Sequence, residues 1–378
     1  MTIYQVDLFR LPMRGPGDVS GLRQLIEAGT LDPRDIVAIL GKTEGNGGVN
    51  DFTREYASLA FATLLAGYLA CTNAEIEARV ALVMSGGTEG VLSPHASVFA
   101  RRRVEKKESV GKRLAIGVAH TRDFLPEELG RHIQIVETAR AVQAAMQDAQ
   151  IDCAADVHFV QIKCPLLTSE RIEAAYARGC KPVTDDPYGS MAYSRGASAL
   201  GVGVGLGEID AAAVSDQAVL TDLSLCSSVA STSAGVELLC NAVIVMGNTE
   251  AAAGDNLIGH AVMRDALDLR GVLDAFKSIG LDVGSGDAEG AKDRILNVFA
   301  KAESSPDGVL RGFRHTMLDD SDINPTRHAR AAVGGLIAAV AGCGAVYVSG
   351  GAEHQGPPGG GPVAVIARSA RDLGAGKT

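Results

Sequence analysis

The pattern of apolar and polar residues predicts one order of elements that recurs along the chain. In the first third, residues 3–13 alternate in polarity as a half-buried strand does. A helix is predicted at 20–28, because Ser20 suits an N-cap and Gly29 ends the run. An apolar strand at 36–40, a small-residue helix at 53–70 and a strand at 80–84 follow. This third therefore alternates strands with helices, which predicts an α/β unit.

The remaining two thirds predict the same order of strand, helix, strand, helix and strand. The middle third has its strands at 113–119 and 156–162, a helix at 127–149 and a helical run led by Arg195; the last third has strands at 257–263, 295–300 and 345–348 and helices at 272–279 and 331–341. The charged segment 101–107 reads as a solvated linker. We therefore predict three repeat units, 1–104, 112–250 and 256–378.

A short signature, S-[GA]-G-x-E, supports the repeat because it occurs once in each unit, at 85–89, 233–237 and 349–353. Each copy is followed by an apolar run, at 97–100, 242–246 and 363–367. An apolar strand upstream ends in a lysine in every unit, and an arginine lies between that lysine and the serine. The lysines are Lys42, Lys163 and Lys301, and the arginines are Arg54, Arg195 and either Arg327 or Arg330.

Such a recurrence predicts three α/β units packed around a pseudo-threefold axis with the active site at the centre. Residues at equivalent strand ends would then converge on one cavity that holds three serines, three lysines and three arginines. Cations and hydroxyls in that arrangement favour a small, planar, anionic ligand rich in carbonyl groups.

Composition narrows the class of protein. The 378 residues are 46% apolar and 21% charged, as in an ordinary globular protein, and the net charge of -10 argues against a nucleic-acid partner. The seven cysteines are scattered singly, which favours free thiols in a reducing cytoplasm over disulfides or a zinc site. The amino terminus has no signal-peptide pattern, so a cytoplasmic location is expected.

Two further patterns fail a closer test. Residues 331–352 are uncharged, but their glycines favour a helix followed by a strand over a membrane span. The glycine string 201–207 has Leu206 where a dinucleotide fingerprint needs glycine, and Ile36 stands where a phosphate-binding loop around Lys42 needs one. We therefore expect neither a membrane segment nor a nucleotide site.

A serine close to a buried lysine can act as a nucleophile. Burial and neighbouring positive charge lower a lysine pKa, so that the neutral amine can take the serine proton. The backbone amide of a following small residue such as Ala234 can then stabilise the charge on an attacked carbonyl oxygen. The predicted reaction class is acyl transfer to water, and all three serine–lysine pairs have the same parts. Glu89, Glu237 and Glu353 are expected only to brace their loops, and His315 and His354 to be structural.

Several long motifs resemble the cyanuric acid hydrolase and barbiturase family of ring-opening amidohydrolases. They are G-K-T-E-G-N-G at 41–47, N-D-F-T-R-E at 50–55, M-S-G-G-T-E-G at 84–90 and S-G-G-A-E-H-Q-G-P-P at 349–358. The resemblance covers essentially the whole chain and is closer to the cyanuric acid hydrolases. It implies s-triazine degradation, namely opening of the ring of cyanuric acid to carboxybiuret, which loses carbon dioxide to give biuret, with no organic cofactor.

The resemblance also implies roles for particular residues. Ser233 would be the nucleophile and Lys163 its base, while Lys42 and Lys301 belong to supporting dyads. The implied substrate contacts are Arg54, Ser85, Gly86, Arg195, Ser233, Ala234, Ser349, Gly350 and an arginine of the third unit, for which Arg330 is slightly favoured over Arg327.

The family further implies a structural Mg²⁺ or Ca²⁺ and a homotetramer. The metal ligands would be Glu303 and the backbone carbonyls of Ala352, Gln355, Gly356, Pro357 and Gly360. Two alternatives stay open from the sequence. The chain could prefer barbiturate, or it could be a non-catalytic binder of a small anionic cyclic ureide.

Overall fold

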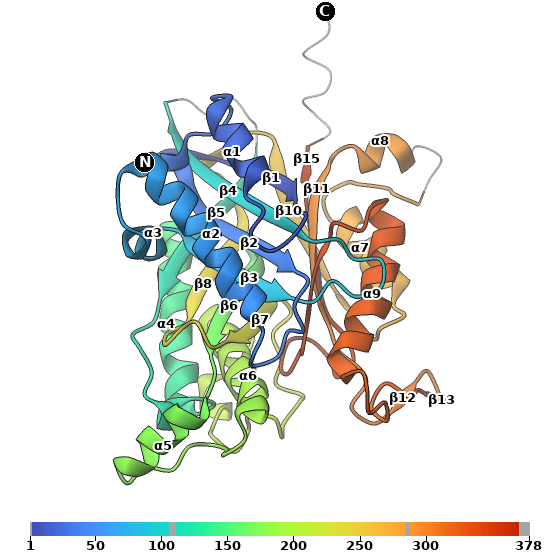
Figure 1. Cartoon of the computed structure of the whole chain (residues 1–378). Coiled ribbons are helices and arrows are strands. Elements are labelled where there is room, and N and C mark those ends of the chain that lie inside the picture. Colours follow the sequence, from blue (N-terminus) through green and yellow to red (C-terminus); the bar gives the residue numbers. More distant parts are fainter. Residues whose placement is uncertain (1, 106–110, 285–287, 370–378) are drawn as a thin grey trace, which may run out of the picture.

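Three sheets form the framework of the computed structural model, which describes residues 2–105, 111–284 and 288–369 (Figure 1). The first sheet has the order β3 (Ala81–Gly86), β2 (Ile36–Thr43), β4 (His95–Val104), β1 (Ile3–Pro12) and β9 (Ala252–Ala253). The second runs β7 (Ala230–Gly235), β6 (Val157–Pro165), β8 (Ala242–Thr249) and β5 (Arg113–His120). The third runs β14 (Tyr347–Gly350), β11 (Ile295–Ala302), β15 (Gly361–Arg368) and β10 (Asn256–Met263), and β12 (Val309–Leu310) pairs separately with β13 (Phe313–Arg314).

The strands that carry the lysines and serines have the same register in every sheet. β2, β6 and β11 each run parallel to the strand that carries the signature serine near its end. This pairing sets Lys42 opposite Ser85, Lys163 opposite Ser233, and Lys301 opposite Ser349. Each lysine strand also pairs antiparallel with the strand that follows the signature. The sheets therefore present three lysine–serine pairs at equivalent places.

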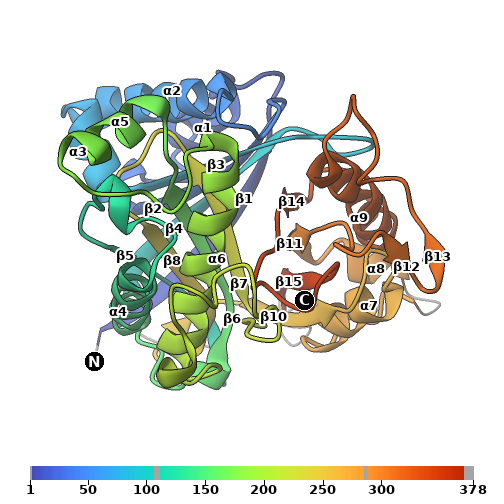
Figure 2. The ribbon, with the colours of Figure 1, turned by 90° about the horizontal axis from the view of Figure 1, so that it is seen from below.

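Helices cover one face of each sheet. The first sheet carries α1 (Ser20–Glu27), α2 (Phe52–Leu69) and α3 (Asn73–Arg79); α4 (His132–Asp148), α5 (Ser169–Ala177) and α6 (Pro187–Leu206) belong to the second; α7 (Leu269–Lys277), α8 (Ala288–Lys292) and α9 (Pro325–Ala341) belong to the third. Short 3-10 turns occupy Pro33–Asp35, Pro126–Glu128, Ala154–Asp156 and Ala211–Ala213. Seen from below, α2, α4 and α9 lie on different sides with strands between them (Figure 2).

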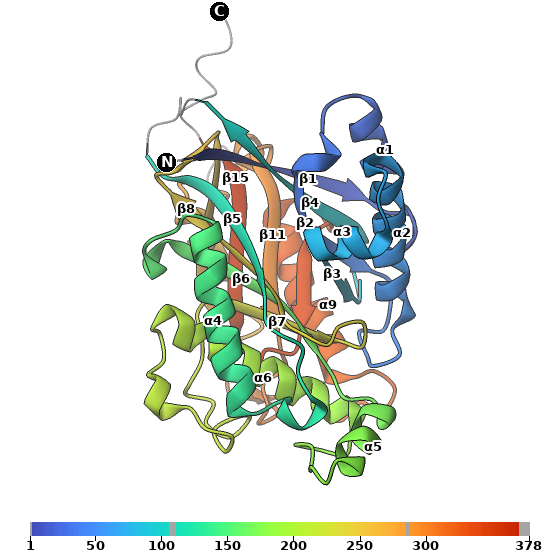
Figure 3. The same cartoon turned by 90° about the vertical axis from the view of Figure 1, so that its left-hand side faces the viewer.

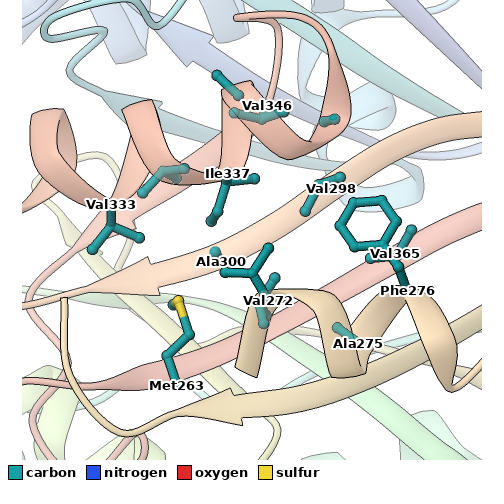
Figure 4. Close-up of a cluster of buried hydrophobic side chains, with 14 of the residues drawn as sticks. Met263, Val272, Ala275, Phe276, Val298, Ala300, Val333, Ile337, Val346 and Val365 are labelled. Atoms are coloured by element: carbon teal, nitrogen blue, oxygen red, sulfur yellow. The ribbon is translucent and has the colours of Figure 1, made fainter. Parts of the chain in front are cut away.

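Alternation along the strands sends side chains to two separate cores. In β11, Val298 and Ala300 face α7 and α9, where they pack with Phe276 and Ile337 (Figure 4). Phe299 points to the opposite face and joins a cluster to which all three sheets contribute. Both faces of these strands are buried, which explains their continuous apolar sequences.

The helices that carry the arginines begin at side-chain caps. Asp51 of α2, Asp186 of α6 and Asn324 of α9 each accept a hydrogen bond from a backbone N–H of the first turn. Proline occupies the first helical position of α6 and α9, where its missing N–H costs no bond. Figure 3 shows α2 beside the first sheet and α4 and α6 beside the second.

The structure corrects several boundaries. The helix expected at 127–149 begins at His132, because Gly130 has a φ of 70° and breaks the run. Arg195 lies in the middle of α6 instead of opening it. Residues 101–104 are the end of β4 and not a linker, and Arg101 donates to Asp148 at 2.8 Å; residues 106 and 107 lie outside the described part.

In the described part of the chain, no single helix is both long and apolar enough to cross a membrane. Among the described helices, one pair, α2 and α3, reaches that length and composition when taken together, and the two are bent by 101°.

Candidate active site

The strand-end lysines are buried and hydrogen-bonded. The exposed fraction is 0% for Lys42 and Lys301 and 1% for Lys163. Lys42 Nζ donates to Ser85 Oγ at 3.1 Å, and Lys301 Nζ donates to Ser349 Oγ at 3.3 Å. Such burial is unusual for lysine and requires partners that compensate for lost hydration.

The lysines also bind across the units. Lys163 Nζ donates to the carbonyl of Met84 at 2.8 Å, immediately before Ser85. Lys301 Nζ donates to the carbonyl of Thr232, also at 2.8 Å, immediately before Ser233. Each of these lysines therefore touches the serine strand of the preceding unit, which brings the strand ends of different sheets together.

A small cavity lies where these strand ends meet. Its walls include every residue that the sequence analysis named as a substrate contact, with Arg330 as the arginine of the third unit. The lining residues are Gly47, Arg54, Ser85, Gly86, Lys163, Met191, Arg195, Ser233, Ala234, Arg330, Ser349 and Gly350. Of the three lysines only Lys163 lines this cavity, whereas Lys42 and Lys301 lie behind their serines.

Each arginine of the cavity faces the signature glutamate of the next unit. Arg195 donates to Glu353 through Nε at 2.8 Å and through a terminal nitrogen at 2.5 Å. Arg330 holds Glu89 in the same two-pronged way, at 2.8 and 2.6 Å. Paired bonds of this kind fix the plane of the guanidinium group. The glutamates are thus positioning residues for the arginines.

The third pair, between Arg54 and Glu237, is looser. Arg54 Nε lies 3.8 Å from Glu237 Oε1, and the same oxygen lies 3.1 Å from Lys163 Nζ. From the sequence, Glu237 and its two equivalents are expected only to brace their loops. The recurrence of a glutamate in every copy of the signature could have indicated a functional role. The arginine that each glutamate contacts belongs to another unit, however, and a single sequence does not show which units are in contact. Gly47 and Met191 were missed as well, since neither recurs.

The charges of the site influence one another. Burial lowers the pKa of Lys42 well below its usual value, and the charge of Arg330 adds to the effect. Burial and the charge of Arg195 lower the pKa of Lys301 to about 7. Burial also lowers the pKa of Lys163, against the opposing pull of Glu237. A neutral amine is therefore accessible at Lys301 near pH 7, and burial favours the neutral form at Lys42 and Lys163 as well.

Burial would raise the pKa of each signature glutamate, but the cations outweigh it. For Glu237 the pKa falls because Lys163 and Arg54 are close, and for Glu353 it falls because of Arg195. Arg330 acts in the same way on Glu89. The three carboxylates therefore stay ionised.

The residues expected to hold a cation are Glu303, which directly follows β11, and residues of the loop after β14. Glu303 accepts a hydrogen bond from the backbone N–H of Ala352 at 3.2 Å. The carbonyl of Ala352 accepts from the Gln355 N–H, and that of Pro357 accepts from Gly360 N–H. Burial and the nearby charge of Glu353 raise the pKa of Glu303 to about 8.

Two observations bear on other ligands at this loop. In the described part, no group of three or more histidine, cysteine, aspartate or glutamate side chains is placed to bind a metal. Both ring nitrogens of His354 are hydrogen-bonded, one to the N–H of Leu220 and the other to the carbonyl of Leu225. His354 therefore holds its loop against the segment that contains these residues. His315 likewise contacts backbone groups of its own segment.

Comparisons with known proteins agree with the resemblance drawn from the motifs. A model of the family described as amidohydrolase ring-opening protein matches residues 7–368. A cyanuric acid amidohydrolase of Bradyrhizobium diazoefficiens is 64% identical, over 97% of this chain and 99% of its own. One from Pseudomonas sp. strain ADP is 58% identical, over 97% and 100%. A solved cyanuric acid hydrolase, described as an evolutionary innovation by structural concatenation, superposes with a TM-score of 0.94 at 59% identity, over 97% and 100% of the two chains. The chain therefore belongs to the family of ring-opening amidohydrolases.

Proposed function

We propose that this protein hydrolyses the ring of cyanuric acid to carboxybiuret, which loses carbon dioxide to give biuret. The observation that carries the proposal is the cavity itself, into which three units each contribute a serine and an arginine. Three arginines suit a planar anion with carbonyl oxygens on its rim. Relatives at 64% and 58% identity are cyanuric acid amidohydrolases.

The nucleophile in this proposal is Ser233 and the base is Lys163. Lys163 is the lysine that lines the cavity, and the hydroxyl of Ser233 is buried with no hydrogen-bond partner among the described residues. The neutral amine of Lys163 takes the hydroxyl proton as Oγ attacks a ring carbonyl. The N–H of Ala234 faces the resulting oxyanion.

Collapse of this intermediate breaks the ring C–N bond. The departing nitrogen receives the proton that Lys163 took, and the ring opens while one end stays esterified to Ser233. Water then attacks the ester carbonyl, with Lys163 again as base, and releases carboxybiuret and the free serine. The carbamate end of carboxybiuret loses carbon dioxide, and biuret remains.

The threefold organisation is part of the proposal. We infer that units 1–104, 112–250 and 256–378 are repeats related by a pseudo-threefold axis through the cavity. Three observations support this inference. The strand order is the same in the three sheets, and so is the lysine–serine register. In addition, the arginine of each unit pairs with the signature glutamate of the next unit. A ligand with threefold symmetry matches such a pocket.

A divalent cation on the loop after β14 is also proposed. The residues fit a hard cation because their donors are oxygens, with one carboxylate and several backbone carbonyls. Glu303 has a raised pKa and a neighbouring carboxylate, Glu353, so a positive charge would favour its ionised form. Glu303 and the carbonyls of Ala352, Gln355, Gly356, Pro357 and Gly360 would hold it, and it would order the loop that follows Ser349.

Turnover of cyanuric acid and of barbiturate, with wild type and three serine variants, tests the reaction. We expect biuret from cyanuric acid, and Ser233→Ala is expected to reduce kcat by at least about 1,000-fold, as for loss of a nucleophile. Ser85→Ala and Ser349→Ala serve as matched controls and should mainly raise KM. Faster turnover of barbiturate would make the protein a barbiturase. Binding of either ring without turnover would make it a binder. Full activity of Ser233→Ala would refute the assigned dyad.

A further inference from the structure

One of the three arginine–glutamate pairs departs from the pattern of the others. Glu353 and Glu89 each bond their arginine through both carboxylate oxygens, at 2.5 to 2.8 Å. Glu237 Oε1 instead lies 3.8 Å from Arg54 Nε and makes its closer contact, at 3.1 Å, with Lys163 Nζ. The departure is confined to the unit whose lysine lines the cavity.

The hydrogen-bond partners of the lysines differ in the same unit in which the contacts of the glutamate differ. Lys42 and Lys301 donate to the serines opposite them, at 3.1 and 3.3 Å. Lys163 has the same register with Ser233, yet its bonds go to Glu237 and to the carbonyl of Met84. Glu89 and Glu353 therefore pair with arginines in the units whose contacts leave Lys42 and Lys301 bonded to their serines. Glu237 pairs with Lys163, and Ser233 then has no hydrogen-bond partner among the described residues.

This departure leaves three buried polar atoms without hydrogen-bond partners among the described residues. They are Arg54 Nε, Glu237 Oε2 and Ser233 Oγ. Buried polar atoms are rarely left unpaired, and each such atom costs stability. One rearrangement would pair all three. If Glu237 turned its carboxylate onto Arg54 as Glu353 sits on Arg195, Lys163 would be free to bond Ser233.

We propose that Glu237 is a positioning residue that exchanges between Lys163 in the empty site and Arg54 when the ring is bound. The inference deepens the proposed function and rests on it. In the first arrangement Glu237 holds the ammonium of Lys163 away from Ser233. In the second it completes the third arginine pair and leaves the amine facing the nucleophile.

The chemistry of the exchange follows from the charges around Lys163. The ionisable groups that face it are Glu237, Arg54 and Cys164, and Arg171 lies behind Glu237, where it donates to the carbonyl of Val236. When Glu237 leaves, Lys163 loses its counter-charge, and burial together with Arg54 favours the neutral amine. The proton goes to solvent, and the amine can then accept the proton of Ser233. An anionic ring in the cavity favours the exchange because it repels the carboxylate of Glu237 and shields Lys163 from solvent, while Arg54 offers that carboxylate another cation.

Crystal structures of Ser233→Ala, with and without bound cyanurate, test the exchange directly. Neither crystal contains the serine hydroxyl, so the ring is the only difference between them. We expect Glu237 on Lys163 in the ring-free crystal, and both of its oxygens within about 3 Å of Arg54 nitrogens in the complex. Glu237 still on Lys163 beside a bound ring overturns the inference alone. A cavity that does not bind cyanurate overturns the proposed function, and the inference with it.

The pH profile of kcat/KM gives a second test, with Glu353→Gln as the control for Glu237→Gln. The acid limb should report deprotonation of Lys163. Without the carboxylate of Glu237 the amine loses its proton more easily, so the limb should move by about one to three pH units to lower pH. Glu353→Gln should raise KM without this move. An acid limb that stays in place in Glu237→Gln, or moves equally in both variants, overturns the inference.

Discussion

At the scale of single residues, burial and pairing separate groups that the sequence leaves equivalent. Arg327 and Arg330 both contact Glu89. The side chain of Arg330 is 5% exposed and lines the cavity, whereas that of Arg327 is 40% exposed and makes a single bond at 3.1 Å. The pattern Thr-Arg, which Arg327 shares with Arg54, was the misleading signal, since similar neighbours in sequence do not ensure a similar direction on the helix.

Alanine substitution at each arginine tests this distinction. Arg330→Ala leaves Glu89 with one exposed partner and removes a cation from the cavity wall, so kcat/KM for cyanuric acid should fall by about 100-fold or more, as for a truncated buried charge pair. Arg327→Ala should change it by less than about fivefold, as for an exposed ion pair. Steady-state kinetics decides, and equal losses in the two variants would contradict the assignment.

The sequence predicted which residues gather at the cavity because its signal was local and repeated. Lys163, Arg54 and Ser349 stand at strand or helix positions that recur in the sequence, and all three line one cavity. The partners of Arg54, Arg195 and Arg330 were not predictable in this way. Each pairing joins residues from different units, and a single sequence records neither which unit lies next to which nor how a side chain turns.

At the scale of elements, the glycines of α6 have a packing role. The string 201–207 fails as a nucleotide motif. Its first six residues form the C-terminal end of α6, and Gly207 is the C-cap of that helix. A Cβ on Gly201 would lie 2.5 Å from the Cβ of Thr138 on α4, and one on Gly205 would lie 3.0 Å from a carbonyl of the same helix. The glycines therefore permit close approach of α4 and α6, which side chains would prevent.

Gly201→Ala tests this close approach, and Gly335→Ala in α9 is its control because nothing lies within 4 Å of a Cβ there. Overpacking should lower the free energy of unfolding by about 1–3 kcal/mol in Gly201→Ala. The control should gain up to about 1 kcal/mol from helix propensity. Urea denaturation followed by circular dichroism measures both. A gain in the free energy of unfolding in Gly201→Ala would show that the interface between α4 and α6 accommodates a methyl group at this position.

The loop after β14 supplies a prediction about cations. Without a cation, the stability contributed by the neutral carboxyl of Glu303 is complete below its ordinary pKa and is lost as pH rises to about 8. Bound Mg²⁺ or Ca²⁺ should restore stability over that range, by about 2.7 kcal/mol when the cation is at 100 times its Kd. Thermal unfolding with and without millimolar MgCl₂ or CaCl₂, at pH 6 and 8.5, measures this. Glu303→Gln should abolish the response, and an equal response in that variant would place the cation elsewhere.

At the scale of the whole molecule, one cluster joins the three sheets. Phe299 of β11 lies 6.1 Å from Phe99 of β4 and 5.7 Å from both Phe159 of β6 and Tyr347 of β14, measured between ring centroids. These rings stand on the faces turned away from the helices. Two of these strands, β6 and β14, also reach the cavity, through Lys163 and Ser349, so the central cluster and the site share part of their support.

Phe299→Ala should weaken all three units together. Removal of this buried ring should lower the free energy of unfolding by about 3–5 kcal/mol. Because the chain has no tryptophan, tyrosine fluorescence and circular dichroism can follow chemical denaturation. The two signals should move to lower denaturant concentration in parallel. If the fluorescence and circular dichroism transitions occurred at different denaturant concentrations, the units would unfold independently.

The short strand β9 links distant parts of the chain. Ala252 and Ala253, between the second and third sheets in sequence, pair with Tyr4 and Gln5 at the free side of β1, and Asn256 donates to the carbonyl of Val6 at 2.9 Å. This segment occupies an edge at which a foreign strand could otherwise add. Substitutions that detach it would expose the row of amides and carbonyls on β1, and edge-to-edge association between molecules would be the consequence.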